Sequence, residues 1–216
     1  MLKSISLPAL ILSATMCFGQ EPVPELIPCT NPQSWNAQRT YFKGCINSTR
    51  AMILLNGTNA PCGFYRRVID AAVGRGYFVA CPQKTWTGTG QEGADAFDYL
   101  LDIGFQFEHV LVTGHSQGGG GTIGTTRILN IKNPDVTVDM LPIMPAFWMT
   151  PYFKDRAPKL VARKKLVACG NRDTTVPCDG VYDGFLLLQD PKEFHRMVAG
   201  HLNPQREWIM FLEYFQ

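Results

Sequence analysis

Apolar runs of strand length alternate with helix-like stretches from residue 51 to the end of the chain. The apolar runs predict strands at 51–56, 77–82, 109–114, 136–144, 165–170 and 192–200. The stretches between and after them predict helices at 61–76, 92–104, 117–130, 179–189 and 203–215. Because the strands are apolar on both faces, the pattern predicts an α/β fold in which helices cover both faces of a mostly parallel sheet of about six strands. Residues 29–50 are less regular, and there we expect one edge strand at 40–43.

The first residues of the chain have a different pattern from the rest. Lys3 precedes a short apolar stretch, and small residues follow near Gly19, which is the layout of a secretory signal peptide at 1–19. The apolar stretch is shorter than the roughly 20 residues that a membrane-spanning helix needs, so we expect no stable membrane anchor. A proline-rich leader at 20–28 then precedes a single domain at 29–216. We expect a protein secreted to the outside of the cell, or to the periplasm if the source is bacterial.

Composition excludes several classes of partner. The net charge of +2 provides no electrostatic surface for nucleic acid, and we interpret the one compact basic run, 163–165, as a solvated strand entrance. The glycines around residue 118 fit neither the phosphate-binding loop nor the dinucleotide-binding pattern. No histidine pair has the spacing of a metal site. We therefore expect no cofactor, no metal and no nucleic-acid partner, and we expect a monomer.

Export changes the interpretation of the cysteines. The chain has seven, and loss of Cys17 with the signal peptide leaves six. An even number in an oxidising compartment favours disulfides, although six cysteines allow 15 connectivities and buried free thiols are the alternative. We expect pairs that each flank one local unit, namely Cys29 with Cys45, Cys62 with Cys81 and Cys169 with Cys178.

The segment "GHSQG" at 114–118 follows a predicted strand and precedes a predicted helix. It matches G-x-S-x-G, the nucleophile elbow, in which a serine stands on a sharp turn between strand and helix. Bulk two residues before or after Ser116 would collide with neighbouring elements, which explains the glycines. Gln117 begins the helix, so its free backbone N–H and the helix dipole favour a developing oxyanion.

A serine nucleophile needs a general base, and in sheets with this elbow the base is a histidine that follows both the serine and an acid in sequence. His109 and His115 precede the serine, and we expect His115 to be locked into the elbow facing elsewhere. His195 lies within an apolar strand, where a structural role is the simpler interpretation. His201 lies in the loop after that strand, at the sheet edge where ligands bind, and is our candidate base.

The candidate acid is Asp173, which directly follows the strand at 165–170. Asp179 and Asp183 come after Pro177 in a predicted helix, where capping or solvent exposure is the simpler interpretation. A second oxyanion donor should come from the loop after the first strand of the alternating pattern. There we expect the backbone N–H of Thr58, with an ordinary turn as the alternative.

Three segments carry a resemblance that covers about residues 51–216: "GHSQGGGGT", "CGNRDTTVP" and "AGHLNP". They resemble the elbow, acid loop and histidine loop of the α/β-hydrolase fold, most closely its branch of bacterial polyester hydrolases and cutinases with their dienelactone hydrolase relatives. The resemblance implies that Ser116, Asp173 and His201 form a catalytic triad, and that Thr58 and Gln117 form the oxyanion hole. It also implies that Trp148 clamps an aromatic or acyl unit. Polyester hydrolases usually have methionine where this chain has Gln117 and an aromatic residue where it has Thr58, and the chain looks shorter, without much of their N-terminal sheet.

The sequence thus predicts a secreted serine hydrolase that cleaves short-chain or polymeric carboxylic esters through an acyl-enzyme. Trp86, Phe147 and Trp148 are the candidate substrate-binding residues. Two alternatives stay open: a carbohydrate esterase that removes acetyl or feruloyl groups from plant polysaccharide, and a catalytically silent binding module.

Overall fold

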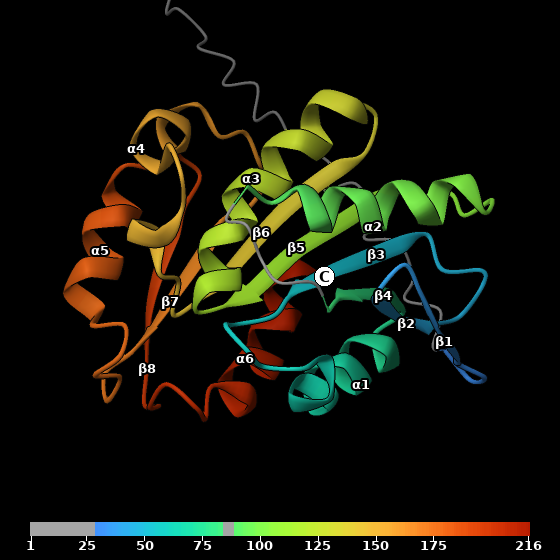
Figure 1. Cartoon of the computed structure of the whole chain (residues 1–216), viewed down its shortest axis with the longest axis horizontal. Helices are drawn as coiled ribbons and strands as arrows, with labels where there is room; N and C mark the ends of the chain where they lie inside the picture. Colours follow the sequence, from blue (N-terminus) through green and yellow to red (C-terminus); the bar gives the residue numbers. More distant parts are fainter. Residues whose placement is uncertain (1–28, 84–88) are drawn as a thin grey trace, which may run out of the picture.

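The protein is built around one eight-stranded sheet with helices on both faces, as a computed structural model shows (Figure 1). The structure describes residues 29–83 and 89–216. The expected signal peptide, the leader and Trp86 lie outside the described residues. The strand order is β1-β2-β4-β3-β5-β6-β7-β8.

Six of the strands are parallel and agree with the apolar runs of the sequence. They are β3 (Arg50–Leu55), β4 (Tyr77–Pro82), β5 (His109–His115), β6 (Thr137–Ile143), β7 (Leu166–Gly170) and β8 (Glu193–Met197). Successive residues of β3 enter opposite cores, because Met52 and Leu54 face one layer of helices and Ile53 and Leu55 face the other. This two-sided burial explains why the strands read as continuous apolar runs.

The other two strands extend the expected sheet: β2 is the strand expected at 40–43, but β1, which was not expected, takes the edge position. β1 (Gln33–Ala37) and β2 (Thr40–Gly44) form an antiparallel hairpin, and β2 pairs antiparallel with β4. The turn between them places Gln38 and Arg39 at φ values of 47° and 58°. Such hairpin turns favour glycine and asparagine, so this turn gave no recognisable signal, and most of β1 is polar and exposed.

The helices form one layer on each face of the sheet. Figure 1 shows α1 (Arg66–Gly74) and α6 (Gln205–Phe211) below the sheet, where Trp208 is buried against β5. On the other side lie α2 (Gln91–Asp102), α3 (Gln117–Lys132) and α5 (Cys178–Leu186). The remaining elements are short: η1 (Cys62–Tyr65), η2 (Phe147–Met149), α4 (Phe153–Arg156), η3 (Ala157–Lys159) and η4 (Leu212–Phe215). Two predicted helices are therefore composite, since η1 precedes α1 and η4 follows α6.

Three disulfides join residues that are close in sequence. They are Cys29–Cys45, Cys62–Cys81 and Cys169–Cys178, with separations of 16, 19 and 9 residues. These are the pairs that the sequence favoured. The first ties the beginning of the described chain to the end of β2, the second ties η1 to β4, and the third ties β7 to the first residue of α5.

The basic run 163–165, which was expected to be solvated, takes part in a buried ionic cluster. Oδ2 of the fully buried Asp139 accepts hydrogen bonds from His109 Nε2 at 2.7 Å and Arg163 at 2.6 Å. Burial acts to raise the pKa of this carboxyl, but the hydrogen bonds from His109 and Arg163 outweigh it and hold that pKa below its ordinary value. Lys165 is only 1% exposed, and its ammonium donates to the carbonyl of Ala162 at 3.0 Å. The run is thus partly buried and paired, because its residues pack where β6 meets the start of β7.

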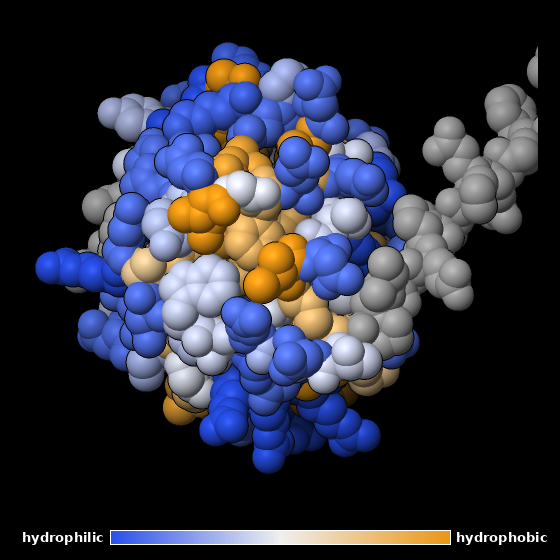
Figure 2. Space-filling model, turned by 90° about the vertical axis from the view of Figure 1, so that its right-hand side faces the viewer, coloured by the Kyte–Doolittle hydropathy of each residue, from blue (hydrophilic) through white to orange (hydrophobic). Residues whose placement is uncertain are grey.

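The surface at the β1–β2 end of the sheet is mostly hydrophilic, with a small group of apolar side chains near its centre (Figure 2). Within 29–83 and 89–216, every helix is too short or too polar to span a bilayer.

Candidate active site

The turn between β5 and α3 holds Ser116 in a conformation that few residues adopt. Its φ and ψ are 55° and −121°, in a region where a side chain is strained unless the surroundings enforce it. Glycines make the turn possible. A Cβ on Gly118 would collide with the carbonyl oxygens of Leu55 and Asn56, and a Cβ on Gly114 would lie 2.5 Å from the carbonyl oxygen of Gly118. The sequence "GHSQG" thus meets the steric requirement that the elbow pattern implied.

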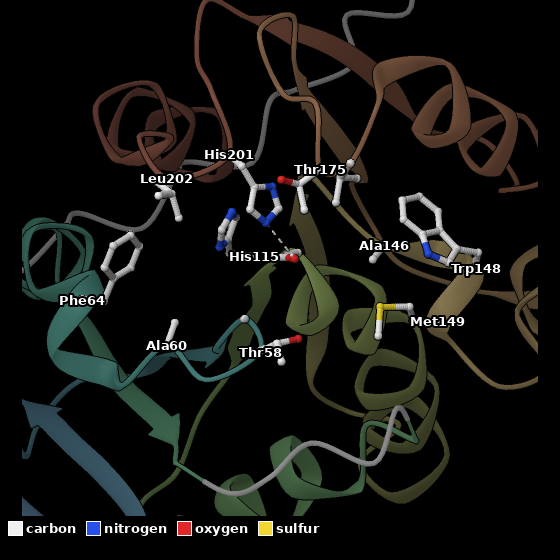
Figure 3. Close-up of a pocket in the computed structure, with 13 residues that line it drawn as sticks. Thr58, Ala60, Phe64, His115, Ala146, Trp148, Met149, Thr175, His201 and Leu202 are labelled. Carbon is white, nitrogen blue, oxygen red and sulfur yellow. Dashed lines mark hydrogen bonds between the residues drawn. The ribbon is translucent and has the colours of Figure 1, made fainter.

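The structure brings Ser116, His201 and Asp173 into one hydrogen-bonded chain. Nε2 of His201 lies 3.0 Å from Oγ of Ser116 (Figure 3), and Nδ1 of His201 donates to Oδ2 of Asp173 at 2.7 Å. A carboxylate only accepts, so Nδ1 carries the proton of the neutral imidazole and Nε2 is free to accept from the serine.

Backbone amides hold the carboxylate of Asp173 in place. Its Oδ1 accepts hydrogen bonds from the N–H groups of Thr175 and Val176, both at 2.8 Å. Asp173 follows β7 and His201 follows β8, so both side chains come from loops at the carboxyl ends of strands. The Cys169–Cys178 disulfide closes the loop that contains Asp173.

The two expected oxyanion donors also lie beside the serine. Gln117 is the first residue of α3, so its N–H is among the amides that have no acceptor within the helix. Thr58 lies in the loop after β3, and its hydroxyl donates to Oε1 of Gln117 at 2.6 Å. This side-chain bridge joins the two segments that carry the amides, and no sequence pattern indicated it.

An open cleft of about 430 Å³ runs past Ser116. Figure 3 shows Ala60, Phe64 and Leu202 on one side of His201, and Ala146, Trp148 and Met149 on the other side. The indole of Trp148 is 58% exposed, so it is available to a ligand. The lining is mainly apolar to either side of the polar centre, which suits a molecule with apolar groups on both sides of its reacting bond.

Of the other two candidate substrate-binding residues, Phe147 does not line this cleft. Phe147 is 2% exposed, and its ring stacks on Phe153 with centroids 4.4 Å apart. It is therefore a core residue, which corrects the prediction, and Gly184 leaves the space that its ring occupies. Trp86 lies outside the described residues. His195 lies on β8, where the centroid of its ring is 4.8 Å from that of Phe211.

His115 was expected to face away from the site, and this expectation is wrong. It lines the cleft, and its ring centroid lies 4.7 Å from that of His201. The side chain is 3% exposed, and burial, followed by repulsion from the His201 ring, lowers its pKa to about 4. The only sequence signal was its place next to Ser116.

Among residues 29–83 and 89–216, no group of three or more His, Cys, Asp or Glu side chains is arranged to hold a metal ion.

Comparisons with known proteins place this geometry in a known architecture. In sequence, the chain matches no protein-family model and no curated protein. In structure, it is similar to a predicted CIB-like hydrolase from Thermoplasma acidophilum, with a TM-score of 0.62, 16% identity, and coverage of 86% of this chain and 96% of the other. The chain has the α/β-hydrolase fold.

Two further structures have the same fold. Est1E from Butyrivibrio proteoclasticus gives a TM-score of 0.62 at 10% identity, covering 85% of this chain and 96% of the other. The esterase domain of a Rhodothermus marinus protein gives a TM-score of 0.61 at 13% identity, covering 86% of this chain and 95% of the other. The predicted fold class is therefore confirmed. At these identities the likeness extends to the fold alone.

Proposed function

We propose that this α/β-hydrolase-fold protein is a secreted serine esterase that uses Ser116, His201 and Asp173 as nucleophile, general base and orienting acid. The observation that carries the proposal is the hydrogen-bonded chain from Ser116 Oγ through the His201 ring to the Asp173 carboxylate, with contacts of 3.0 and 2.7 Å. A chain of this kind activates a serine hydroxyl that is otherwise a weak nucleophile.

The reaction proceeds in two acyl transfers. Ser116 Oγ attacks the ester carbonyl while its proton passes to Nε2 of His201, and the Asp173 carboxylate stabilises the resulting imidazolium. The negative charge that forms on the carbonyl oxygen is stabilised by the backbone N–H groups of Thr58 and Gln117. The intermediate collapses and breaks the ester C–O bond, and His201 returns its proton to the departing alcohol. Water then attacks the acyl-enzyme with His201 again as the base, which releases the carboxylic acid and restores Ser116.

The cleft supports an ester with apolar groups on both sides of the reacting carbonyl. Phe64 and Leu202 lie at one end and Trp148 and Met149 at the other, with His201 between them (Figure 3). Since the cleft is open, short-chain esters and accessible bonds of an apolar polyester are the proposed substrates, in the manner of a cutinase. The three disulfides fit an oxidising compartment and support export.

Active-site labelling tests the proposal. A fluorophosphonate should label the wild-type protein and the control variant Ser34→Ala, which changes an exposed serine of β1, whereas Ser116→Ala should not be labelled. The same proteins are then assayed on p-nitrophenyl esters of graded chain length, on polyester film and on acetylated xylan. Loss of turnover in Ser116→Ala alone supports the mechanism. Release of acetate from xylan without cleavage of simple apolar esters would make the protein a carbohydrate esterase, and a folded protein that neither labels nor hydrolyses any ester would be a binding module.

A further inference from the structure

His115 is a buried imidazole in the wall of the cleft that the reaction above does not use. Its Nδ1 lies 3.2 Å from the hydroxyl of Tyr65, and its ring is inclined by 41° to that of His201 at a centroid distance of 4.7 Å. Tyr65 is the last residue of η1 and is fully buried. The Tyr65 hydroxyl, His115 and His201 therefore form a continuous row of contacts beside the site.

We assign the proton of neutral His115 to Nε2, from the way the Tyr65 hydroxyl is shared between two partners. The Tyr65 oxygen accepts the N–H of Gly57 at 2.8 Å, so the single hydroxyl proton is available to His115 Nδ1. A donor at Nδ1 requires the tautomer with its proton on Nε2. Burial raises the pKa of Tyr65 to about 12 and lowers that of His115 to about 4, so both groups are neutral at pH 7.

The same hydroxyl reaches the loop that carries the oxyanion donor. Gly57 directly precedes Thr58, and its amide is anchored on Tyr65. The packing is tight, because a Cβ on Gly57 would lie 3.2 Å from both His115 Nδ1 and the Tyr65 hydroxyl. One oxygen atom thus contacts both the oxyanion loop and the residue that backs the general base.

We propose that Tyr65 and His115 form a positioning pair: the Tyr65 hydroxyl, together with burial, holds His115 neutral and in one orientation against His201, and the same hydroxyl holds the oxyanion loop at Gly57. This inference rests on the proposed function. A positive charge on His115 would repel the imidazolium that forms on His201 during each acyl transfer, so neutrality of His115 favours the reaction. The ionisable groups that face His115 are His201, Asp173 and the Tyr65 hydroxyl, from the loops after β8 and β7 and from η1.

Two tyrosine variants separate positioning from stability. Tyr65→Phe removes the hydroxyl, and Tyr77→Phe is the matched control, because Tyr77 is also fully buried, also has a pKa of about 12, and bonds Arg50 at 2.6 Å away from the site. Both variants should lower the melting temperature. Tyr65→Phe should also lower kcat about tenfold with KM within about twofold, the kinetic equivalent of one lost hydrogen bond. Tyr77→Phe should leave both constants within about twofold of wild type.

The pH profile of kcat/KM and the tautomer of His115 are two measurements that would not change if Tyr65 had a purely structural role. In Tyr65→Phe the freed Nδ1 of His115 can take up a proton, so the acid limb of kcat/KM should steepen from one ionisation to two and move to higher pH. The double variant Tyr65→Phe/His115→Phe should return to one ionisation. In wild type, nitrogen NMR should show His115 neutral with its proton on Nε2 from pH 8 down to pH 5, assigned by the signals missing in His115→Phe.

The outcomes separate this inference from the proposed function. A wild-type protein that labels at Ser116 and hydrolyses esters, with Tyr65→Phe indistinguishable from Tyr77→Phe in kcat and pH profile, would overturn the positioning pair alone. A His115 that titrates between pH 5 and 8, or that carries its proton on Nδ1, would overturn it as well, even if Tyr65→Phe does not fold. Absence of Ser116 labelling in wild type would reject the proposed function and this inference with it.

Discussion

The disulfide between Cys169 and Cys178 should contribute both to stability and to catalysis, because the loop that it closes contains Asp173. Replacing both cysteines with alanine removes the cross-link at a separation of 9 residues. The chain-entropy relation assigns a loop of this size about 2.6 kcal/mol of unfolding free energy. For a domain of this size, that loss lowers the melting temperature by about 5–10 °C.

The catalytic effect follows from the hydrogen bonds inside the loop. Asp173 depends on the amides of Thr175 and Val176 for its position, and these residues lie between the two cysteines. Without the cross-link, the loop fluctuates more and the carboxylate meets the His201 ring in fewer productive geometries. We expect kcat to fall about tenfold at 25 °C, since displacements of less than 1 Å affect positioned catalytic groups strongly.

The matched control is the pair Cys29→Ala/Cys45→Ala, which opens a loop of 16 residues at the edge of the sheet. The same relation gives this loop about 3.1 kcal/mol, so the control should be at least as destabilised. Its kcat should stay within about twofold of wild type, because the residues that it frees do not line the cleft. The assay is thermal unfolding with kcat measured well below the melting transition. Equal kcat in the two double variants would refute the reasoning that the disulfide fixes the acid loop.

Three further outcomes are expected. Asp173→Asn should keep the fold but lower kcat by about 10⁴, because an amide stabilises the wrong tautomer of His201, and steady-state kinetics with a thermal-unfolding control check this. Gly120→Leu should cost about 3 kcal/mol in urea unfolding, since even a Cβ there would collide with Thr150 Oγ1 and approach the Ala146 carbonyl to 3.0 Å, while turnover per fluorophosphonate-labelled site stays unchanged. Asp139→Asn should lower the free energy of unfolding by about 3 kcal/mol at pH 7, because a neutral amide replaces the buried carboxylate that accepts hydrogen bonds from His109 and Arg163. The folded-state pKa of Asp139 lies below its ordinary value, so the stabilisation by this carboxylate is present above about pH 4 and is lost as the pH falls through that lower pKa. The difference in unfolding free energy between wild type and Asp139→Asn should therefore be smaller in urea titrations at pH 3 than at pH 7. A difference that does not change with pH would contradict this.

Much of this fold follows from the chain's apolar pattern. Both faces of the central strands are covered, so the apolar pattern is continuous there and marks β3 to β7, whereas the edge strand β8 is mostly exposed. The sequence indicated β2 but not β1, because β1 is mostly exposed and the turn between them uses Gln38 and Arg39 in a left-handed conformation. Its existence depends on pairing with β4, which is a tertiary contact.

The candidate site also has residues that the sequence indicates and contacts that only the folded structure shows. Ser116, Asp173 and His201 each lie in a loop at a strand end, and the order of elements along the chain is sufficient to suggest that they meet. The orientation of Phe147 and Trp148 depends on which side of a short 3₁₀ turn packs against Gly184, and the sequence has no periodicity over three residues that would reveal it. Tyr65 and His115 are 50 positions apart, and their contact arises only when η1 packs beside β5.

The glycines at the start of α3 determine which parts of the cleft are open to engineering. Gly118 and Gly119 bring the helix against the main chain of neighbouring segments, where a Cβ on Gly119 would lie 2.9 Å from the Ile143 carbonyl. The floor under Ser116 is therefore made of backbone, and side-chain substitutions cannot reshape it without displacing the helix. A library that seeks new substrate preferences should leave this floor untouched and diversify the rim instead, at Phe64, Trp148 and Leu202.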